Sequence, residues 1–539
     1  MEKQQNRQAY NPYLPLYEYV PDGEPHVFGD RLYLYGSHDR FDGEMFCLND
    51  YVCYSADLHN LRDWRYEGVI FRKEQDPRNQ KEGEPDEIPF IYDTKGRFAG
   101  GLNAPGIHAL WAPDVVQGRD GRFYLYYCLD FLPEIGVAVC DTPAGAYEFF
   151  GFVRHADGTL LGQREGDLGQ FDPGIFIDDD GEIYLYSGNA PMYREHIGGK
   201  QASQVMTLEQ DMLTLKKDPV KLLPDLSDSE GTGFEGHEFF EASSIRKING
   251  VYYLIYSSVL SRELCYATSR YPDRGYQFGG TLVDICDAGI DGRTAEHAHN
   301  CSGNTHGSIE NVLGQWYVFY HRQTNRTQYS RQGCAERITI AEDGTIAQVP
   351  VTSCGLNGGP LRGEGSYPAA ICCHLTGKNG IPFSDQIKMK WEYPFLTQDF
   401  ADRDPEKTDT AERLSQSSLE EKMETANVTQ YIANFADGCT AGYKFFDFTS
   451  ESSASVLLRG RAYGTLKIAV DDETCKTVCG EIPVRIYTEK WTELCGTVRI
   501  PAGVHSMYFK YEGSGWADFA AFEWKPLALS ESVKRSTVD

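Results

Sequence analysis

The sequence predicts an all-β protein in which a five-bladed β-propeller is followed by a β-sandwich of the jelly-roll type. Two observations support this prediction: a tyrosine-rich strand pattern recurs five times before residue 345, and alternating apolar strands return after residue 428. Helical periodicity is nearly absent, and its best stretch, 410–424, lies between the two regions. We therefore divide the chain into a propeller, a connecting segment, a sandwich and a tail, over 1–345, 346–427, 428–528 and 529–539.

The propeller is predicted from five segments that share a turn glycine and an alternating aromatic strand. They are GDRLYLY, GRFYLYY, GEIYLYS, GVYYLIY and GQWYVFY, which begin at Gly29, Gly121, Gly181, Gly250 and Gly314. The central tyrosines of successive segments are 91, 60, 69 and 64 residues apart, and a second apolar run precedes each segment. One strong hairpin per repeat of this length is typical of a four-stranded blade with long connections. The alternative is a large sandwich in which the tyrosine strands recur by coincidence.

An ionisable residue occupies the same register in all five repeats, ten to twelve residues before the central tyrosine. These residues are Asp22, Asp114, Asp172, Glu241 and His306. Because the innermost strands of a propeller surround one axis, we expect these side chains to converge at one mouth. Carboxylates gathered in this way repel and desolvate one another, and proteins usually keep such a costly cluster for function. Taken singly, an aspartate before glycine or proline is also an ordinary turn residue.

Glu241 differs from the others because it lies in an apolar aromatic run, Phe239-Phe240-Glu241-Ala242. Burial among apolar side chains raises the pKa of a carboxyl group, which is what a general acid requires. Two carboxyl groups whose pKa values are pushed apart by their surroundings are the pair that hydrolyses a glycosidic bond. A third carboxylate nearby would hold the pKa of the acid up by repulsion.

Six segments, in this order, resemble the motifs of glycoside hydrolase family 43 across the propeller region. They are Pro21-Asp22-Gly23, Trp111-Ala112-Pro113-Asp114, Phe171-Asp172-Pro173, Phe239-Phe240-Glu241, Gly303-Asn304-Thr305-His306 and Ser330-Arg331. The resemblance implies that Asp22 is the general base and Glu241 the general acid. Asp172 would modulate the pKa of the acid and orient it.

The same resemblance implies a sugar site lined by Trp111, Arg331 and His306. The arginine would approach the bound sugar and reinforce the electrostatics of the acid and base. His306 would lie near the axial channel, where it is a candidate ligand for a structural calcium ion. A buried histidine that satisfies backbone groups is the alternative interpretation.

By this resemblance the protein is an inverting, exo-acting glycoside hydrolase of the β-xylosidase or α-L-arabinofuranosidase type. It would release terminal xylose, arabinose or both from arabinoxylo-oligosaccharides of plant cell walls. An inverting mechanism places the two carboxyl groups about 6.5–9.5 Å apart, which leaves room for a water molecule. Two other functions stay open: a non-catalytic sugar-binding propeller, and a glycoside phosphorylase, which would need a basic phosphate site where we identify only Arg331.

The sandwich is predicted from six short alternating strands after Val428. Its closing segment, YEGSGWADFAAFEW, resembles carbohydrate-binding modules of family 6. Trp516 follows Gly-Ser-Gly and is a candidate stacking platform for sugar, whereas Phe522 and Trp524 alternate as core residues do. We favour a structural or pocket-shaping role for this module over sugar binding.

Composition restricts the partners and the compartment. The chain has 51 Lys+Arg and 79 Asp+Glu, a net charge of −28, so we expect neither nucleic acid nor an anionic membrane to bind it. Its 15 cysteines are irregularly spaced, which favours the reducing cytoplasm, and no 18 apolar residues run together. We expect an oligosaccharide substrate, no required cofactor and calcium as the one candidate ion, and the oligomeric state stays open.

Overall fold

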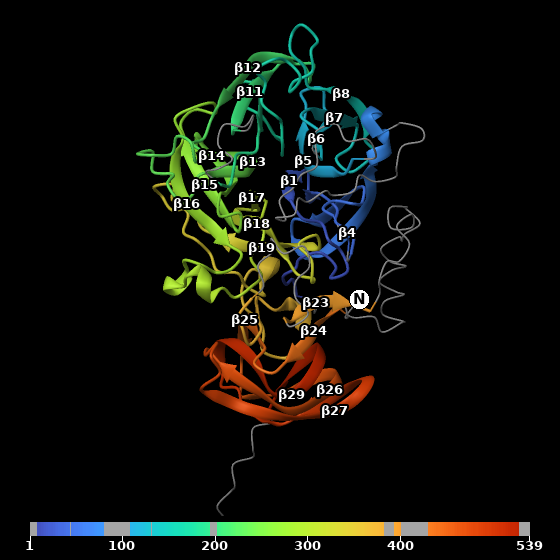
Figure 1. The fold of residues 1–539 in the computed structure, drawn as a ribbon, viewed down its shortest axis with the longest axis vertical. Coiled ribbons are helices and arrows are strands. Elements are labelled where there is room, and N and C mark those ends of the chain that lie inside the picture. Colours follow the sequence, from blue (N-terminus) through green and yellow to red (C-terminus); the bar gives the residue numbers. More distant parts are fainter. Residues whose placement is uncertain are drawn as a thin grey trace, which may run out of the picture.

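The computed structural model contains a propeller and a second β domain, which lies below the propeller in Figure 1. It describes residues 8–41, 43, 45–79, 108–130, 132–193, 202–381, 393–399 and 430–527. The helices in these ranges are single 3-10 turns: η1 (Lys73–Gln75), η2 (Pro77–Asn79), η4 (Ile290–Gly292), η5 (Ala295–His297), η6 (Gly355–Asn357) and η7 (Ala369–Ile371). Among the described residues, no helix has the length and apolar character that crossing a membrane would demand. The stretch 410–424 and the tail 529–539 lie outside the described residues.

Five antiparallel sheets form the blades, and their strands follow one another in chain order. The first blade consists of β1 (Glu24–Phe28), β2 (Arg31–Tyr35), β3 (Tyr51–Asp57) and β4 (Asn60–Phe71). The second consists of β5 (Leu110–Gln117), β6 (Phe123–Leu129), β7 (Ile135–Cys140) and β8 (Glu148–Phe152). The third consists of β9 (Gly174–Ile177), β10 (Ile183–Ser187), β11 (Gln204–Leu208) and β12 (Leu215–Lys221). The fourth consists of β13 (Phe239–Ile248), β14 (Val251–Ser258), β15 (Glu263–Ser269) and β16 (Gln277–Asp284). In the described part of the fifth blade there are three strands, β17 (Ile309–Val312), β18 (Gln315–Gln323) and β19 (Arg331–Ile338).

The predicted tyrosine strands are β2, β6, β10, β14 and β18, the second strand of each blade. Each hairpin glycine before them has a positive φ, from 63° to 91°, which glycine adopts without the clash that a Cβ would cause. Side chains of β2 alternate between two cores: Leu32 and Leu34 face the fifth blade, whereas Tyr33 and Tyr35 face the second. The hydrophobic core therefore lies between blades, and the tyrosine excess fills these layers. The prediction of a five-bladed propeller is confirmed.

The first strands of the blades surround the axis, where β1 contacts β5 and β17, and β9 contacts β5 and β13. A parallel bridge between Gly23 and Gly307 joins the first blade to the fifth and closes the ring. Because the register residues lie at the start of these strands, closure brings them to one end of the axis.

The C-terminal domain is a mixed sheet of long strands. It contains β24 (Gln430–Ala436), β25 (Thr440–Phe448), β26 (Ser452–Val470), β27 (Val478–Cys495), β28 (Thr497–Val498) and β29 (Gly503–Pro526). Four short strands from the predicted connecting segment join the same ten-stranded sheet: β20 (Leu361–Arg362), β21 (Gly365–Pro368), β22 (His374–Thr376) and β23 (Phe395–Gln398). Phe522 and Trp524 are buried in its core, and the indole of Trp516 is 43% exposed.

The prediction of six short strands is wrong in their length, because β26 has 19 residues and β29 has 24. Gly464 of β26 faces Gly513 of β29 in the ladder. A Cβ on Gly464 would lie 2.3 Å from the carbonyl oxygen of Glu512. These glycines permit a close approach of two long strands, and they do not end either strand.

Ion pairs join the two domains. Arg293 of the propeller donates both terminal nitrogens to Glu473 at 3.0 and 2.9 Å, and His299 Nε2 lies 2.8 Å from the same carboxylate. In the opposite direction, Lys444 Nζ donates to Asp287 Oδ2 at 2.7 Å. Gln430 at the start of β24 donates to the Tyr19 hydroxyl at 3.1 Å.

Candidate active site

All six residues that the sequence predicts for the site line one cavity of about 430 Å³ at the propeller axis. They are Asp22, Trp111, Asp172, Glu241, His306 and Arg331. Aromatic side chains form much of the remaining wall, namely Phe46, Phe171, Tyr193 and Phe240. Asp114, which shares the register, does not line this cavity; its carboxylate accepts the N–H of Ile175 at 2.8 Å and meets His26 Nε2 at 2.6 Å.

Unusual backbone conformations aim the three carboxylates. Asp22 and Asp172 have positive φ angles of 56° and 44°, immediately before β1 and β9. Aspartate tolerates this region better than most residues with a side chain. In β13 the pairing register shifts on both sides of Glu241, and Ala242 has a φ of 69°. A bulge of this kind redirects one side chain, here the carboxylate that faces the cavity.

Asp22 is buried between a guanidinium and an imidazole. Arg331 Nη1 donates to Asp22 Oδ1 at 3.0 Å, and His321 Nδ1 lies 3.2 Å from the same oxygen. Burial by itself raises the pKa of Asp22, but the charge of Arg331 and the contact with His321 outweigh it and hold that pKa well below its usual range. Asp22 is therefore an ionised carboxylate, the state that a general base needs.

Arg331 is itself held by Asp39. Its Nε and Nη2 donate to the two oxygens of Asp39, each at 2.9 Å. The guanidinium also lies over the ring of Phe46, with 4.7 Å between Cζ and the ring centroid. The bidentate pair fixes the plane of the guanidinium and directs Nη1 at Asp22. The resemblance gives Arg331 a sugar-binding role, but its guanidinium donates to groups of the chain itself: the carboxylates of Asp39 and Asp22 and, from Nη2 at 3.3 Å, the sulfur of Cys47. Its position supports an electrostatic role toward Asp22.

Glu241 has the opposite surroundings. It is half-buried beside Phe240, and its carboxyl group accepts a hydrogen bond from Asn189 Nδ2 at 3.2 Å. Burial, followed by repulsion from Asp172, raises the pKa of Glu241 well above its ordinary value. These surroundings favour the protonated form of Glu241, the form that a general acid needs.

Asp172 and His306 form a pair at the inner end of the cavity. His306 Nδ1 lies 3.5 Å from Asp172 Oδ2, and its Nε2 lies 3.7 Å from Glu24 Oε1. Burial raises the pKa of Asp172, and the bond to His306 opposes this rise. Burial lowers the pKa of His306, but Asp172 and Glu24 reverse this effect and raise it well above its ordinary value. The two carboxylates on either side of His306 thus favour its imidazolium form.

This arrangement does not fit His306 as a calcium ligand. A protonated imidazole has no free lone pair, and both ring nitrogens already face carboxylates. Calcium also prefers oxygen ligands to nitrogen. We derive no step of the reaction through a metal ion.

Four residues of the site are not among the sequence predictions: Asp39, His321, Asn189 and Glu24. Their separations from the residues they contact are large; Asp39 and Arg331, for example, are 292 positions apart. One signal could have pointed to Asp39: the polar pair His38 and Asp39 interrupts the apolar pattern shortly after β2.

A propeller whose axial cavity joins an ionised aspartate to a protonated glutamate defines the class of carboxylate-based glycoside hydrolases. The comparisons with known proteins agree. The model of "Glycosyl hydrolases family 43" matches residues 27–346, and the chain belongs to this family.

Two curated relatives show how far the similarity extends. A "Xylosidase/arabinosidase" of Thermoclostridium stercorarium is 46% identical over 519 residues, which cover 96% of this chain and 98% of that protein. A "Xylosidase/arabinosidase" of Bacteroides ovatus is 29% identical over 57% of this chain and 87% of that protein. One similar solved structure is a family 43 β-xylosidase/α-arabinofuranosidase from a compost microbial metagenome, in complex with xylotriose and in a calcium-free form. It is 23% identical, has a TM-score of 0.44 and covers 64% of this chain and 98% of that one.

Proposed function

We propose that the protein is an inverting, exo-acting glycoside hydrolase that removes terminal xylose or arabinose from arabinoxylo-oligosaccharides. The observation that carries this proposal is that Asp22 and Glu241 line one cavity in surroundings that shift their pKa values in opposite directions, that of Asp22 down and that of Glu241 up. The two relatives of Thermoclostridium stercorarium and Bacteroides ovatus are both described as xylosidase/arabinosidase, which supports the choice of sugars.

In the proposed reaction Asp22 removes a proton from a water molecule, whose oxygen attacks the anomeric carbon. Glu241 gives its proton to the departing glycosidic oxygen, so that the leaving sugar departs as a neutral alcohol. Asp172 keeps the pKa of Glu241 high until this transfer, because a second negative charge beside it is unfavourable. The reaction uses only carboxyl groups of the chain and requires no cofactor.

The cavity favours hydrolysis over the two alternatives. A purely sugar-binding propeller gains nothing from a buried carboxylate pair whose repulsion costs stability. A phosphorylase needs cations for the phosphate, and within the described residues Arg331 is the only lysine or arginine of the cavity wall. That guanidinium is already bound by Asp39 and Asp22.

Fifteen cysteines, none of them in a disulfide, support a cytoplasmic location, where thiols stay reduced. We therefore propose short imported oligosaccharides as the substrate rather than the intact polymer. The C-terminal domain would have a structural role, in line with its ion pairs to the propeller.

Hydrolysis of aryl β-xylosides and aryl α-arabinofuranosides by Glu241→Ala tests the acid. On substrates with poor leaving groups kcat/KM should fall by about 10²–10⁴-fold, the usual contribution of a general acid. An aryl glycoside with a good leaving group should be partly spared. Full activity of Glu241→Ala on natural linkages would show that another residue is the acid.

The stereochemistry tests the base independently. Proton NMR of the first turnovers should show the anomer opposite to that of the substrate, because Asp22 activates water on the far side of the sugar. A retained anomer would exclude Asp22 as a base in a single displacement.

A further inference from the structure

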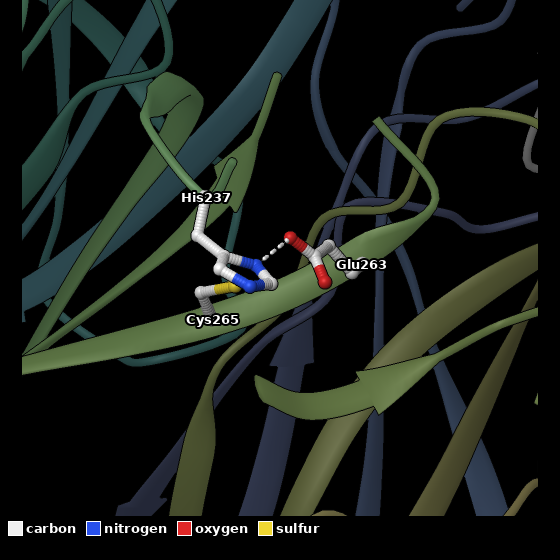
Figure 2. Close-up of side chains that lie close together, drawn as sticks. All are labelled: His237, Glu263 and Cys265. Atoms are coloured by element: carbon white, nitrogen blue, oxygen red, sulfur yellow. Dashed lines mark hydrogen bonds and ion pairs between the residues drawn. The ribbon is translucent and has the colours of Figure 1, made fainter. Parts of the chain in front are cut away.

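A cluster of three metal-ligating side chains lies in the fourth blade, outside the cavity: His237, Glu263 and Cys265 (Figure 2). One ligand atom of each residue lies within 4.8 Å of the others. Glu263 and Cys265 are two residues apart on β15 and so point to the same face of the sheet, while His237 reaches the cluster from the segment before β13. The blade thus brings a nitrogen, an oxygen and a sulfur ligand together.

Hydroxyl groups hold the Glu263 carboxylate in place. Ser258 Oγ donates to Glu263 Oε1 at 2.5 Å, and Thr281 Oγ1 donates to Oε2 at 3.1 Å. His237 Nδ1 lies 2.6 Å from Oε1. Hydrogen bonds of this kind to a carboxylate orient it and are typical of the surroundings of metal ligands.

The cluster is open on one side only. Cys265 is fully buried, with its Sγ 3.8 Å from Thr281 Oγ1. The His237 side chain is 34% exposed and stacks on Phe278, with ring centroids 4.8 Å apart. An ion can therefore enter past the imidazole, while the thiol stays protected from bulky reagents.

Charge separates this cluster from the two similar ones in the described chain. Glu263 makes no ion pair with a lysine or arginine in the part of the chain that the structure describes. In the group His299, His374 and Glu473, both nitrogens of the Arg293 fork bind the carboxylate, so an added cation would meet a fixed positive charge. The third group, Glu24, His26 and Asp114, belongs to the propeller axis.

We propose that His237, Glu263 and Cys265 bind one divalent transition-metal ion of the zinc class. Thiolate and imidazole ligands favour zinc or cobalt over calcium and magnesium, which prefer oxygen. On binding, Cys265 loses its S–H proton and His237 its Nδ1 proton to solvent, and the ion takes both vacated positions. The thiolate and the carboxylate then neutralise its two charges, which a largely buried site requires.

A short stretch of chain connects the cluster to the wall of the axial cavity. Ser258, the last residue of β14, donates to Glu263, and Leu260 and Ser261, which line that cavity, follow two and three positions later. No residue of the cluster lines it. The inference is therefore independent of the proposed hydrolase function.

Titration of the full-length protein with Co²⁺ alone tests the proposal. Cobalt bound to a thiolate shows a sulfur-to-metal charge-transfer absorption that imidazole and carboxylate ligands do not produce. We expect this absorption to saturate at one Co²⁺ per chain, to disappear on addition of Zn²⁺, and to be absent in Cys265→Ser. Melting temperature is a poorer readout, since the 15 thiols of the unfolded chain also bind metal.

The exposed Cys495 provides the matched control, because Cys495→Ser removes a thiol outside the cluster and should leave the absorption unchanged. His237→Gln should bind Co²⁺ at least tenfold more weakly, and its partly exposed side chain makes it the deciding variant if Cys265→Ser does not fold. Each of four results would overturn the proposal. The absorption could be absent in the wild-type protein, persist in Cys265→Ser or be lost in Cys495→Ser, or His237→Gln could bind Co²⁺ with unchanged affinity.

Discussion

Arg331 shows how one buried cation favours the ionised form of a carboxyl group, that of Asp22, the proposed base. Its fork is fixed on Asp39, and the remaining nitrogen reaches Asp22. Burial alone would favour the protonated form of Asp22, so the ionised base depends on this neighbour. The pair Asp39 and Arg331 thus places a positive charge beside the proposed base.

Replacement of Arg331 by glutamine should therefore raise the pKa of Asp22. Hydrolysis requires the ionised aspartate and is lost as the pH falls through that pKa, so the acid limb of kcat/KM should move to higher pH. Arg331→Lys keeps a positive charge and should give an intermediate limb. Near-ultraviolet circular dichroism establishes that each variant is folded, and an acid limb that stays in place would contradict the role given to Arg331.

Glu241 should cost the protein stability at alkaline pH. Its pKa is raised in the folded state above the unfolded value, so its stabilising contribution is present at low pH and is lost as the pH rises through the folded pKa. Glu241→Gln cannot ionise and should gain stability relative to the wild type with increasing pH. Urea unfolding of both proteins from pH 5 to 9 measures the difference in the free energy of unfolding. A difference that does not change with pH would contradict the raised pKa of Glu241.

The close approach of β26 and β29 should make Gly464 intolerant of a side chain. A Cβ there would lie 2.3 Å from a backbone carbonyl oxygen, which has no room to move in a paired strand. Gly464→Val should cost about 1–3 kcal/mol of unfolding free energy. Gly359→Ala is the matched control, since nothing lies within 4 Å of its added carbon and its effect should be small. Equal effects of the two substitutions in urea unfolding would contradict the packing.

The sequence predicts those elements whose pattern lies within a short stretch of the chain, and it does not reveal contacts between distant residues. The five blades were predictable, because each strand carries its own aromatic alternation and turn glycine. The common register predicted the convergence of Asp22, Asp172, Glu241 and His306, but it also included Asp114, which does not line the cavity. Glycines that permit strand contact, such as Gly464, look like turn glycines in a sequence, and the Asp39–Arg331 pair unites positions 292 apart, so neither was predicted.

The two domains should be held together in part by the ion pairs of Glu473 with Arg293 and His299. Burial opposes its ionisation, but Arg293 and His299 lower its pKa below the ordinary value. The pairing therefore stabilises the protein at neutral pH and is lost as the pH falls through that lowered pKa. Glu473→Gln should melt a few degrees below the wild type at pH 7, and the gap should narrow in acid and at high salt. A gap that persists under both conditions would assign the effect to packing rather than charge.

The bridge between Gly23 and Gly307 makes catalysis depend on a finished ring. Asp22 comes from the start of the chain, whereas His321 and Arg331, which keep it ionised, come from the fifth blade. During synthesis, Asp22 can therefore gain the neighbours that favour its ionised form only after residue 331 has been made and the two ends of the propeller have met. Any opening of this seam returns Asp22 to ordinary solvent, so damage that merely parts the first and last blades would silence the enzyme before the other blades unfold.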